Sequence, residues 1–219
     1  MRRKARAERV ARHALSAFEF AKKWSRPFNK KRMATTANWT LLPPQTSVRG
    51  NKTAPIVGPD GPPRLHLPCT TSPFGAGTFQ PDPAATRLSI DLVVTPDMEA
   101  VLREIDEWAI AALQEKASLF FKKETDVRNC FKSCISEHAK DGKVYPSTLR
   151  CKLNTCGPNA LRHWTADKLP REAPESYKNC SLTCAVVVRS IWFMASQCGV
   201  TIDVTDCLVE EDYGPECPF

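Results

Sequence analysis

The most regular hydrophobic pattern in the chain begins at residue 96, where apolar residues recur every three or four positions. Thr95 suits the N-cap of a helix and Pro96 suits its first position. Asp97 and Glu99 suit the positive end of the helix dipole. The pattern therefore predicts a long amphipathic helix, at about residues 96–123, whose apolar side packs against a core. That side consists of Met98, Val101, Leu102, Ile105, Trp108, Ala109, Ala112 and Leu113.

Alternation of polar and apolar residues predicts β-strands in much of the remaining chain. Residues 148–154 alternate basic with apolar side chains, which places Arg150 and Lys152 on one half-exposed face. Asp141-Gly142 is a turn signal, and a short helix is expected before it, over residues 126–137. Further strands are expected at residues 88–94 and 161–165, and in a C-terminal hairpin, 183–195 and 199–209, that turns at Gln197-Cys198-Gly199.

Residues 38–83 are rich in Pro and Gly, which argues against helix and favours short edge strands and loops. Residues 67–79 resemble a loop that displays two aromatic rings, Phe74 and Phe79. One long helix and five or more strands indicate an α+β chain that is mainly β. Its strands most simply form a small barrel or sandwich with the helix packed at one end.

Charge is distributed unevenly along the 219 residues. The net charge is +7, but residues 1–32 hold twelve Lys or Arg against two acidic residues, and the remainder holds 19 basic against 22 acidic residues. The basic segment, residues 1–37, suits an organelle transit peptide, a nuclear localisation signal or a nucleic-acid-binding arm. An internal start at Met33 is a further alternative. No apolar run approaches the ~18 residues of a membrane span, so no membrane association is expected.

Ten cysteines without a secretory signal favour a reducing compartment and free thiols. Zinc coordination by closely spaced cysteines is the alternative, and it would make the chain a zinc- or thiol-stabilised interaction module without nucleic-acid binding. Neither a metal nor a cofactor is the expectation, however, because His is absent at zinc-finger spacing. A cysteine–histidine enzyme, with Cys151 or Cys156 beside His163, ranks third. The candidate zinc pairs are Cys130/Cys134, Cys180/Cys184 and Cys151/Cys156.

Basic and aromatic residues are interleaved on the predicted strands, as in proteins that bind single-stranded nucleic acid by contacting phosphates and stacking on bases. Trp164 and Phe193 could instead be core residues. Arg189 and Phe193 are separated by an even number of residues and would share one face of an uninterrupted strand. The candidate contact residues are Arg150, Lys152, Arg162 and Arg189 for phosphates, and Trp164, Phe193, Phe74 and Phe79 for bases.

The last ten residues, 210–219, are acidic and end on an aromatic ring. An anionic peptide of this kind can occupy a basic groove, and its terminal ring and carboxylate can bind a partner's pocket. The residues expected to contact a partner are Glu210, Glu211, Asp212, Tyr213 and Phe219.

Several segments, in this order, resemble the phage-like single-stranded DNA-binding proteins of large eukaryotic DNA viruses. They are Leu67-Pro-Cys-Thr-Thr-Ser-Pro-Phe-Gly75, the long helix, Thr148-Leu-Arg-Cys-Lys-Leu153 and Ile191-Trp-Phe with Cys198-Gly-Val-Thr201. The tail is similar to the acidic, Phe-terminated tips of bacterial and phage single-strand binding proteins. The resemblance covers about residues 38–219 and implies an OB-like antiparallel β-barrel with an inserted helix.

Together these features predict a non-enzymatic single-stranded DNA-binding protein with a binding domain at residues 38–209. By resemblance, the tail would recruit replication, recombination or repair proteins. The nucleus is the expected location, with the mitochondrion or plastid as the alternative. The sequence does not decide whether the protein forms a homodimer.

Overall fold

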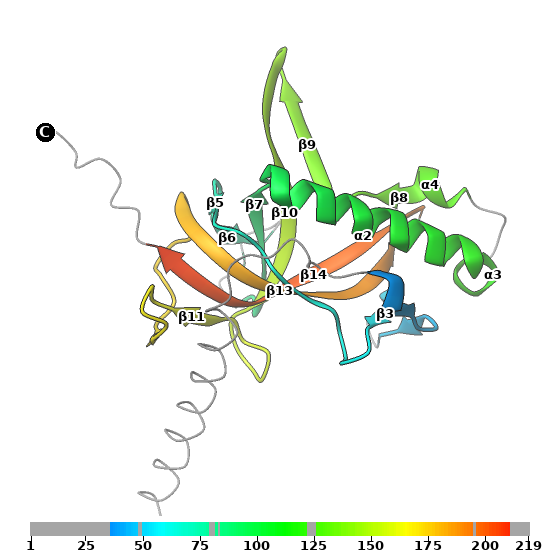
Figure 1. The fold of residues 1–219 in the computed structure, drawn as a ribbon, viewed down its shortest axis with the longest axis horizontal. Helices are drawn as coiled ribbons and strands as arrows, with labels where there is room; N and C mark the ends of the chain where they lie inside the picture. The colour runs from blue at the N-terminus through cyan, green and yellow to red at the C-terminus, as the bar shows by residue number, and fades with distance from the viewer. Residues whose placement is uncertain are drawn as a thin grey trace, which may run out of the picture.

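The computed structural model describes residues 36–47, 50–78, 82, 84–121, 126–194 and 196–210. Within these ranges the chain is mainly β, with one long helix (Figure 1). The first part of the chain forms η2 (Thr36–Asn38), β1 (Thr40–Leu41), β2 (Gln45–Thr46), β3 (Lys52–Val57), β4 (Arg64–His66), β5 (Thr70–Ser72), β6 (Ala76–Gly77) and β7 (Arg87–Val93). The second part forms α2 (Pro96–Glu115), α3 (Ala117–Phe120), α4 (Val127–Cys130), β8 (Phe131–Lys132), β9 (Ile135–Lys140), β10 (Lys143–Asn154), β11 (Arg162–Trp164), β12 (Pro170–Arg171), β13 (Cys180–Met194) and β14 (Gln197–Glu210).

The strands follow the order β3-β13-β14-β10-β7-β6, in which β10 and β14 are parallel and the other neighbours antiparallel. The segment Thr70–Gly77 links β7, near one end of this order, back to β13, because its β6 pairs with β7 and its β5 pairs with β13. The sheet therefore closes on itself. A small barrel of this kind is OB-like. The predicted fold class, α+β and mainly β with an OB-like barrel, is confirmed.

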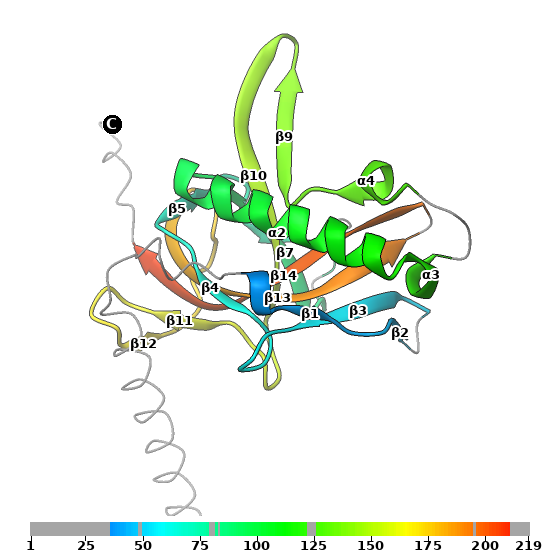
Figure 2. The ribbon, with the colours of Figure 1, turned by 45° about the vertical axis from the view of Figure 1, so that its right-hand side comes forward.

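Helix α2 forms where the hydrophobic pattern predicts it. The Thr95 side chain accepts a hydrogen bond from the Met98 amide, and Pro96 occupies the first turn. The predicted apolar side is buried in the core, with Trp108 and Ala112 half-buried at its margin. The helix ends at Glu115, and a separate turn of helix, α3, follows Lys116. In Figures 1 and 2, α2 lies across one side of the barrel.

The predicted helix over residues 126–137 is wrong. Only one turn, α4, is helical, and the chain then forms the two strands β8 and β9. The reason is the Asp141-Gly142 turn, where both residues have positive φ, 52° and 74°. This turn folds β9 back on β10 as a hairpin, and the hairpin projects from the body of the molecule in both ribbon views (Figures 1 and 2).

The C-terminal hairpin is present but turns two residues earlier than predicted. Met194 pairs with Gln197, so residues 197–199 belong to β14 rather than to the turn. The strands predicted at 88–94, 148–154 and 161–165 correspond to β7, β10 and β11.

Asp106 is a buried carboxylate on α2. It accepts hydrogen bonds from Ser133 Oγ at 2.5 Å and from the Cys134 amide at 3.1 Å. A buried charge is costly unless it is paired in this way. These bonds therefore account for an acidic residue within the apolar side of α2, and they attach the start of β9 to the helix.

Candidate nucleic-acid interface

Two β-bulges determine which side chains of the C-terminal hairpin face outward. Register shifts occur between Ala185 and Val186 and between Val188 and Ser190. At the first, β14 has one extra residue, so Asp203 and Asp206 lie on the same, outer face. At the second, Arg189 is the extra residue on β13.

Asp203 is the centre of the outer face. It is 4% exposed, and its two oxygens accept hydrogen bonds from two arginines on different strands. Arg87 Nη2 on β7 lies 2.8 Å from Oδ1, and Arg189 Nε on β13 lies 3.2 Å from Oδ2. Because a guanidinium has five N–H donors, both arginines keep donors for a ligand while the carboxylate fixes their position.

Arg150 and Lys152 lie beside this centre on β10, on one face as predicted. Arg150 makes two hydrogen bonds to Asp91 on β7, at 2.8 and 3.0 Å, and its side chain is 63% exposed. Lys152 Nζ donates to Ser89 Oγ at 2.7 Å. Burial, then the nearby charges of Arg87 and Arg150, lower the pKa of Lys152. Crowding of cations lowers a lysine pKa because it disfavours the charged form, and an added anion would reverse that effect.

Arg162 and Trp164 extend the outer face along β11. Arg162 Nε lies 2.7 Å from Asp206 Oδ1, and the Trp164 Nε1–H donates to the same oxygen at 3.1 Å. Trp164 is only 3% exposed, so its ring has no free face on which a base could stack. Its predicted stacking role therefore finds no geometric support.

Phe193 lies on the opposite side of β13 from Arg189, so the predicted shared face is wrong. The bulge at Arg189 inverts the alternation, and Phe193 points inward instead. Its ring stacks on Phe120 at 5.6 Å between centroids and has Lys52 Nζ 5.2 Å from its centre. Phe193 is thus part of the packing beneath α3.

The same bulge turns Trp192 outward, which the sequence reasoning missed. Trp192 is half-buried, and it pairs with Thr53 on β3 and Gly199 on β14. Gly199 pairs in turn with the exposed Lys132 on β8. The sequence carried no signal for this arrangement, because Gly199 and Lys132 come beside Trp192 only through the register of the strands. Arg87, the first residue of β7, was also missed.

We define the cationic face as the outward side chains of Arg87, Lys132, Arg150, Lys152, Arg162 and Arg189, together with Trp192. These six basic groups are accompanied by three carboxylates, Asp91, Asp203 and Asp206. The face therefore combines surplus positive charge, fixed guanidinium groups and one half-exposed indole.

Other predicted contact residues lie elsewhere. Phe74 is 71% exposed in the turn between β5 and β6, at the edge of the barrel next to β7. Glu210 is the last residue of β14, and its carboxylate accepts a weak hydrogen bond from Cys69 Sγ at 3.7 Å. Outside the described residues lie Phe79, Glu211, Asp212, Tyr213 and Phe219.

The observed contacts of the cysteines differ from those that the zinc hypothesis and the cysteine–histidine enzyme hypothesis predict. Cys130 contacts Cys198, which is not its candidate zinc partner Cys134. Cys184 contacts Cys207, which is not its candidate zinc partner Cys180. In the part of the chain that the structure describes, no three His, Cys, Asp or Glu side chains converge as a metal site would need. His163 hydrogen-bonds to the Tyr177 hydroxyl at 2.5 Å, and Cys151 is fully buried. The Cys151–His163 dyad is therefore absent.

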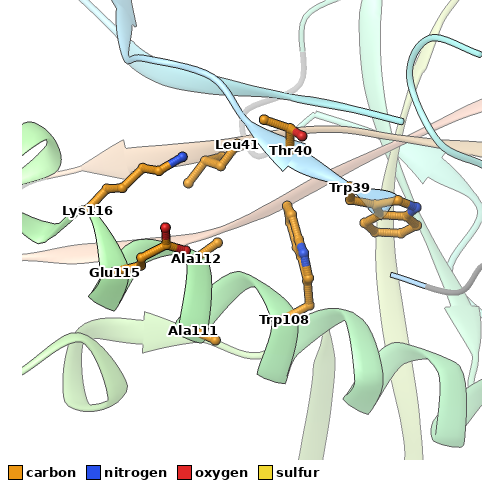
Figure 3. Close-up of a pocket in the computed structure, with 8 residues that line it drawn as sticks. All are labelled: Trp39, Thr40, Leu41, Trp108, Ala111, Ala112, Glu115 and Lys116. Carbon is orange, nitrogen blue, oxygen red and sulfur yellow. The ribbon is translucent and has the colours of Figure 1, made fainter. Parts of the chain in front are cut away.

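A pocket of about 240 Å³ lies away from the cationic face, between β1 and α2 (Figure 3). Its main walls are Trp39 and Trp108, whose rings meet edge to face at 5.3 Å between centroids. The volume is below the ~300 Å³ at which small-molecule sites usually begin. We assign no ligand to it. Within the described residues no helix is long and apolar enough to cross a membrane.

No protein-family model matches this sequence, and no curated protein matches it. Solved structures to which this chain is similar include gp2.5, a single-stranded DNA-binding protein encoded by bacteriophage T7, with a TM-score of 0.47 and 16% identity over 71% of this chain and 92% of that chain. The single-stranded DNA-binding protein of bacteriophage Enc34, in complex with ssDNA, has a TM-score of 0.46 and 14% identity over 80% of this chain and 98% of its own. A C-terminal truncation of the Enc34 protein has a TM-score of 0.46 and 13% identity over 80% and 97%.

Proposed function

We propose that the protein binds single-stranded DNA, without catalysis, through the cationic face. The observation that carries the proposal is the pair of arginines, Arg87 and Arg189, held from two strands by one buried carboxylate, Asp203. Guanidinium groups that are fixed before a ligand arrives lose little conformational freedom on binding phosphate.

The surplus charge supports a polyanionic ligand. Six cations against three carboxylates leave the face positive, so a strand that lies along it would release counterions. The carboxylates offset part of this charge by pairing with the arginines. The side chains of Arg87, Arg150, Arg162 and Arg189 nevertheless remain 36–63% exposed, so they can still contact phosphate.

Trp192 supports a single strand over a duplex. A half-exposed indole offers a surface to an unpaired base, and stacking of this kind contributes about 1–3 kcal/mol per base. In a duplex the bases are already stacked on one another. Phe74, exposed at the barrel edge beside β7, is a second stacking candidate.

Binding is tested by fluorescence anisotropy of a labelled 30-nucleotide oligo(dT) and a matched duplex across a salt series. We expect the single strand to bind more tightly and log Kd to depend linearly on log salt. Arg150→Ala should reduce the salt slope by about 0.7, the contribution of one phosphate contact on a single strand. Lys143→Ala is the matched control, because Lys143 is an exposed cation on the projecting hairpin outside the face.

Two results would overturn the proposal. One is equal affinity for the single strand and the duplex. The other is a loss of affinity in Lys143→Ala as large as that in Arg150→Ala, which would indicate nonspecific attraction to any basic surface.

Finer parts of the function follow from the sequence and are proposed on that basis. The acidic tail would recruit replication, recombination or repair proteins. The basic residues 1–37 would direct the protein to the nucleus. The resemblance to proteins of large eukaryotic DNA viruses stays a prediction. Pull-down with the chain lacking residues 211–219 tests recruitment, since partners retained without the tail would contradict it.

A further inference from the structure

Two cysteine thiols that are far apart in the sequence lie in contact near the edge of the cationic face. Cys130 Sγ on α4 is 3.7 Å from Cys198 Sγ on β14. The two residues sit on separate elements, and β8, which begins right after Cys130, pairs with β14 at Cys198. A contact this short requires only a small approach of the two sulfurs for a disulfide to form.

The two thiols differ in access to solvent. Cys130 is half-buried, whereas Cys198 is fully buried. Burial, together with the hydrogen bond to Cys130, raises the pKa of Cys198 to about 12. Cys130 is therefore the thiol that a dissolved oxidant reaches first, and Cys198 is positioned to react with it afterwards.

The chain provides an internal comparison. Cys184 and Cys207 lie 3.9 Å apart on β13 and β14, but both are only 1% exposed. The sulfur–sulfur distance is nearly the same in the two pairs, but only the Cys130–Cys198 pair contains a thiol that is partly exposed to solvent. Cys156 provides the opposite comparison, because it is exposed.

We propose that Cys130 and Cys198 form a redox-active dithiol that a peroxide converts to a disulfide. The Cys130 thiolate attacks one oxygen of hydrogen peroxide, the O–O bond breaks, and Cys130 becomes a sulfenic acid while the departing hydroxide takes up a proton as water. The sulfur of Cys198 then attacks the Cys130 sulfur, the S–O bond breaks, and the leaving hydroxide takes the Cys198 proton as a second water. The thiols lose two electrons and the peroxide gains them.

The disulfide would connect α4 and β8 covalently to β14. In sequence the next residues are Phe131 and Lys132 on one side and Gly199 on the other, and Lys132 pairs with Gly199 under the ring of Trp192. Oxidation would thereby fix one end of the cationic face. This consequence alone rests on the proposed DNA binding, and the disulfide itself does not.

The test is differential alkylation with mass spectrometry on the full-length protein before and after hydrogen peroxide, followed by dithiothreitol. We expect a peptide pair linked through Cys130 and Cys198, reversed by the reductant, and Cys184 and Cys207 still reduced. The link closes a sequence separation of 68 residues, so Tm should rise by about 5 °C or more on oxidation. In Cys198→Ser, Cys130 should accumulate as a sulfenic acid that dimedone traps.

Three outcomes would overturn the dithiol. They are oxidation of the exposed Cys156 while Cys130 and Cys198 stay reduced, linkage of Cys130 to a cysteine other than Cys198, and an oxidised Tm shift that persists in Cys130→Ser. Cys156→Ser serves as the matched control and should keep both the link and the shift. A change in oligo(dT) affinity on oxidation in wild type, absent in Cys130→Ser, would support the connection to the face. An unchanged affinity with the link formed would remove that connection and leave the dithiol intact.

Discussion

Trp192 and Gly199 face each other so closely across the C-terminal hairpin that no side chain fits at the glycine. A Cβ built at Gly199 would lie 2.8 Å from Cζ2 of the indole and 2.9 Å from the backbone oxygen of Lys132. The glycine therefore sets where the ring lies on the outer face, and Lys132 limits the space on the other side.

Gly199→Ala should displace the Trp192 ring, because the Lys132 backbone cannot yield easily. We expect a loss of about 1–3 kcal/mol in the free energy of unfolding, a shifted tryptophan emission spectrum and weaker oligo(dT) binding. Urea denaturation and anisotropy measure these effects. Gly77→Ala is the control, since a Cβ there would meet nothing within 4 Å. Equal behaviour of the two variants would contradict the proposed close contact.

Asp203→Ala should be the more destabilising of two aspartate substitutions. It removes a buried carboxylate that two arginines share, and we expect a loss of about 2–4 kcal/mol, reduced from the value for a fully buried pair because Arg87 and Arg189 can be hydrated. Asp91→Ala removes the partner of the mostly exposed Arg150, so its cost should be below about 1 kcal/mol. Urea denaturation of both variants tests this order, and a reversed order would exclude Asp203 as the structural centre of the face.

The same Asp91→Ala variant should bind single-stranded DNA more tightly, by about threefold at low salt, because it removes a negative charge and releases Arg150. Anisotropy at two salt concentrations provides the measurement, and the gain should shrink at the higher one. Weaker binding would instead mean that Asp91 holds Arg150 in its binding geometry.

The parts of the fold that depend on local pattern could be predicted, and the parts that depend on register could not. Helix α2 follows from its periodic apolar residues and its Thr95-Pro96 start. The helix expected over residues 126–137 does not form, because the Asp141-Gly142 turn makes β9 a partner for β10. A local pattern does not reveal a pairing partner.

The orientations of the side chains in the candidate nucleic-acid interface also depend on strand register. Arg150, Lys152, Arg162 and Arg189 were identified by residue type and do lie on one outer face. A single inserted residue at Arg189 exchanged the orientations of Trp192 and Phe193, and no feature of the sequence marks that bulge. Arg87 was overlooked because its partner, Asp203, belongs to a strand much later in the chain.

The free energy of unfolding should decrease as the pH falls below about 6.5, and protonation of His163 should account for part of that decrease. Burial, followed by the charge of Arg171, lowers the pKa of His163 from its ordinary value of 6.5. The unfolded chain then binds a proton at a higher pH than the folded chain does, so unfolding becomes more favourable as the pH falls from that value towards the folded pKa. Thermal unfolding from pH 8 to pH 5 measures the effect. His163→Gln should flatten this part of the profile, and an unchanged slope would exclude His163.

Removing residues 211–219 should strengthen binding to single-stranded DNA and abolish recruitment of partner proteins, because an anionic segment competes with DNA for a basic surface. The deletion keeps Glu210, which pairs with Ser181 at the end of β14, so the described strand stays whole. Anisotropy and pull-down measure the two functions separately. If neither changes, the acidic segment has no role in either.

Closure of the barrel has a consequence for how the chain folds. Ala54 pairs with Ile191 and Thr70 pairs with Leu182, so β3 and β5 can pair with β13 only after the final hairpin has been synthesised. Pairings this distant in sequence make folding slow. During translation, β4, β5 and the edge of β3 that pairs with β13 would leave the ribosome before their partner strand is made, and exposed strand edges of this kind favour aggregation.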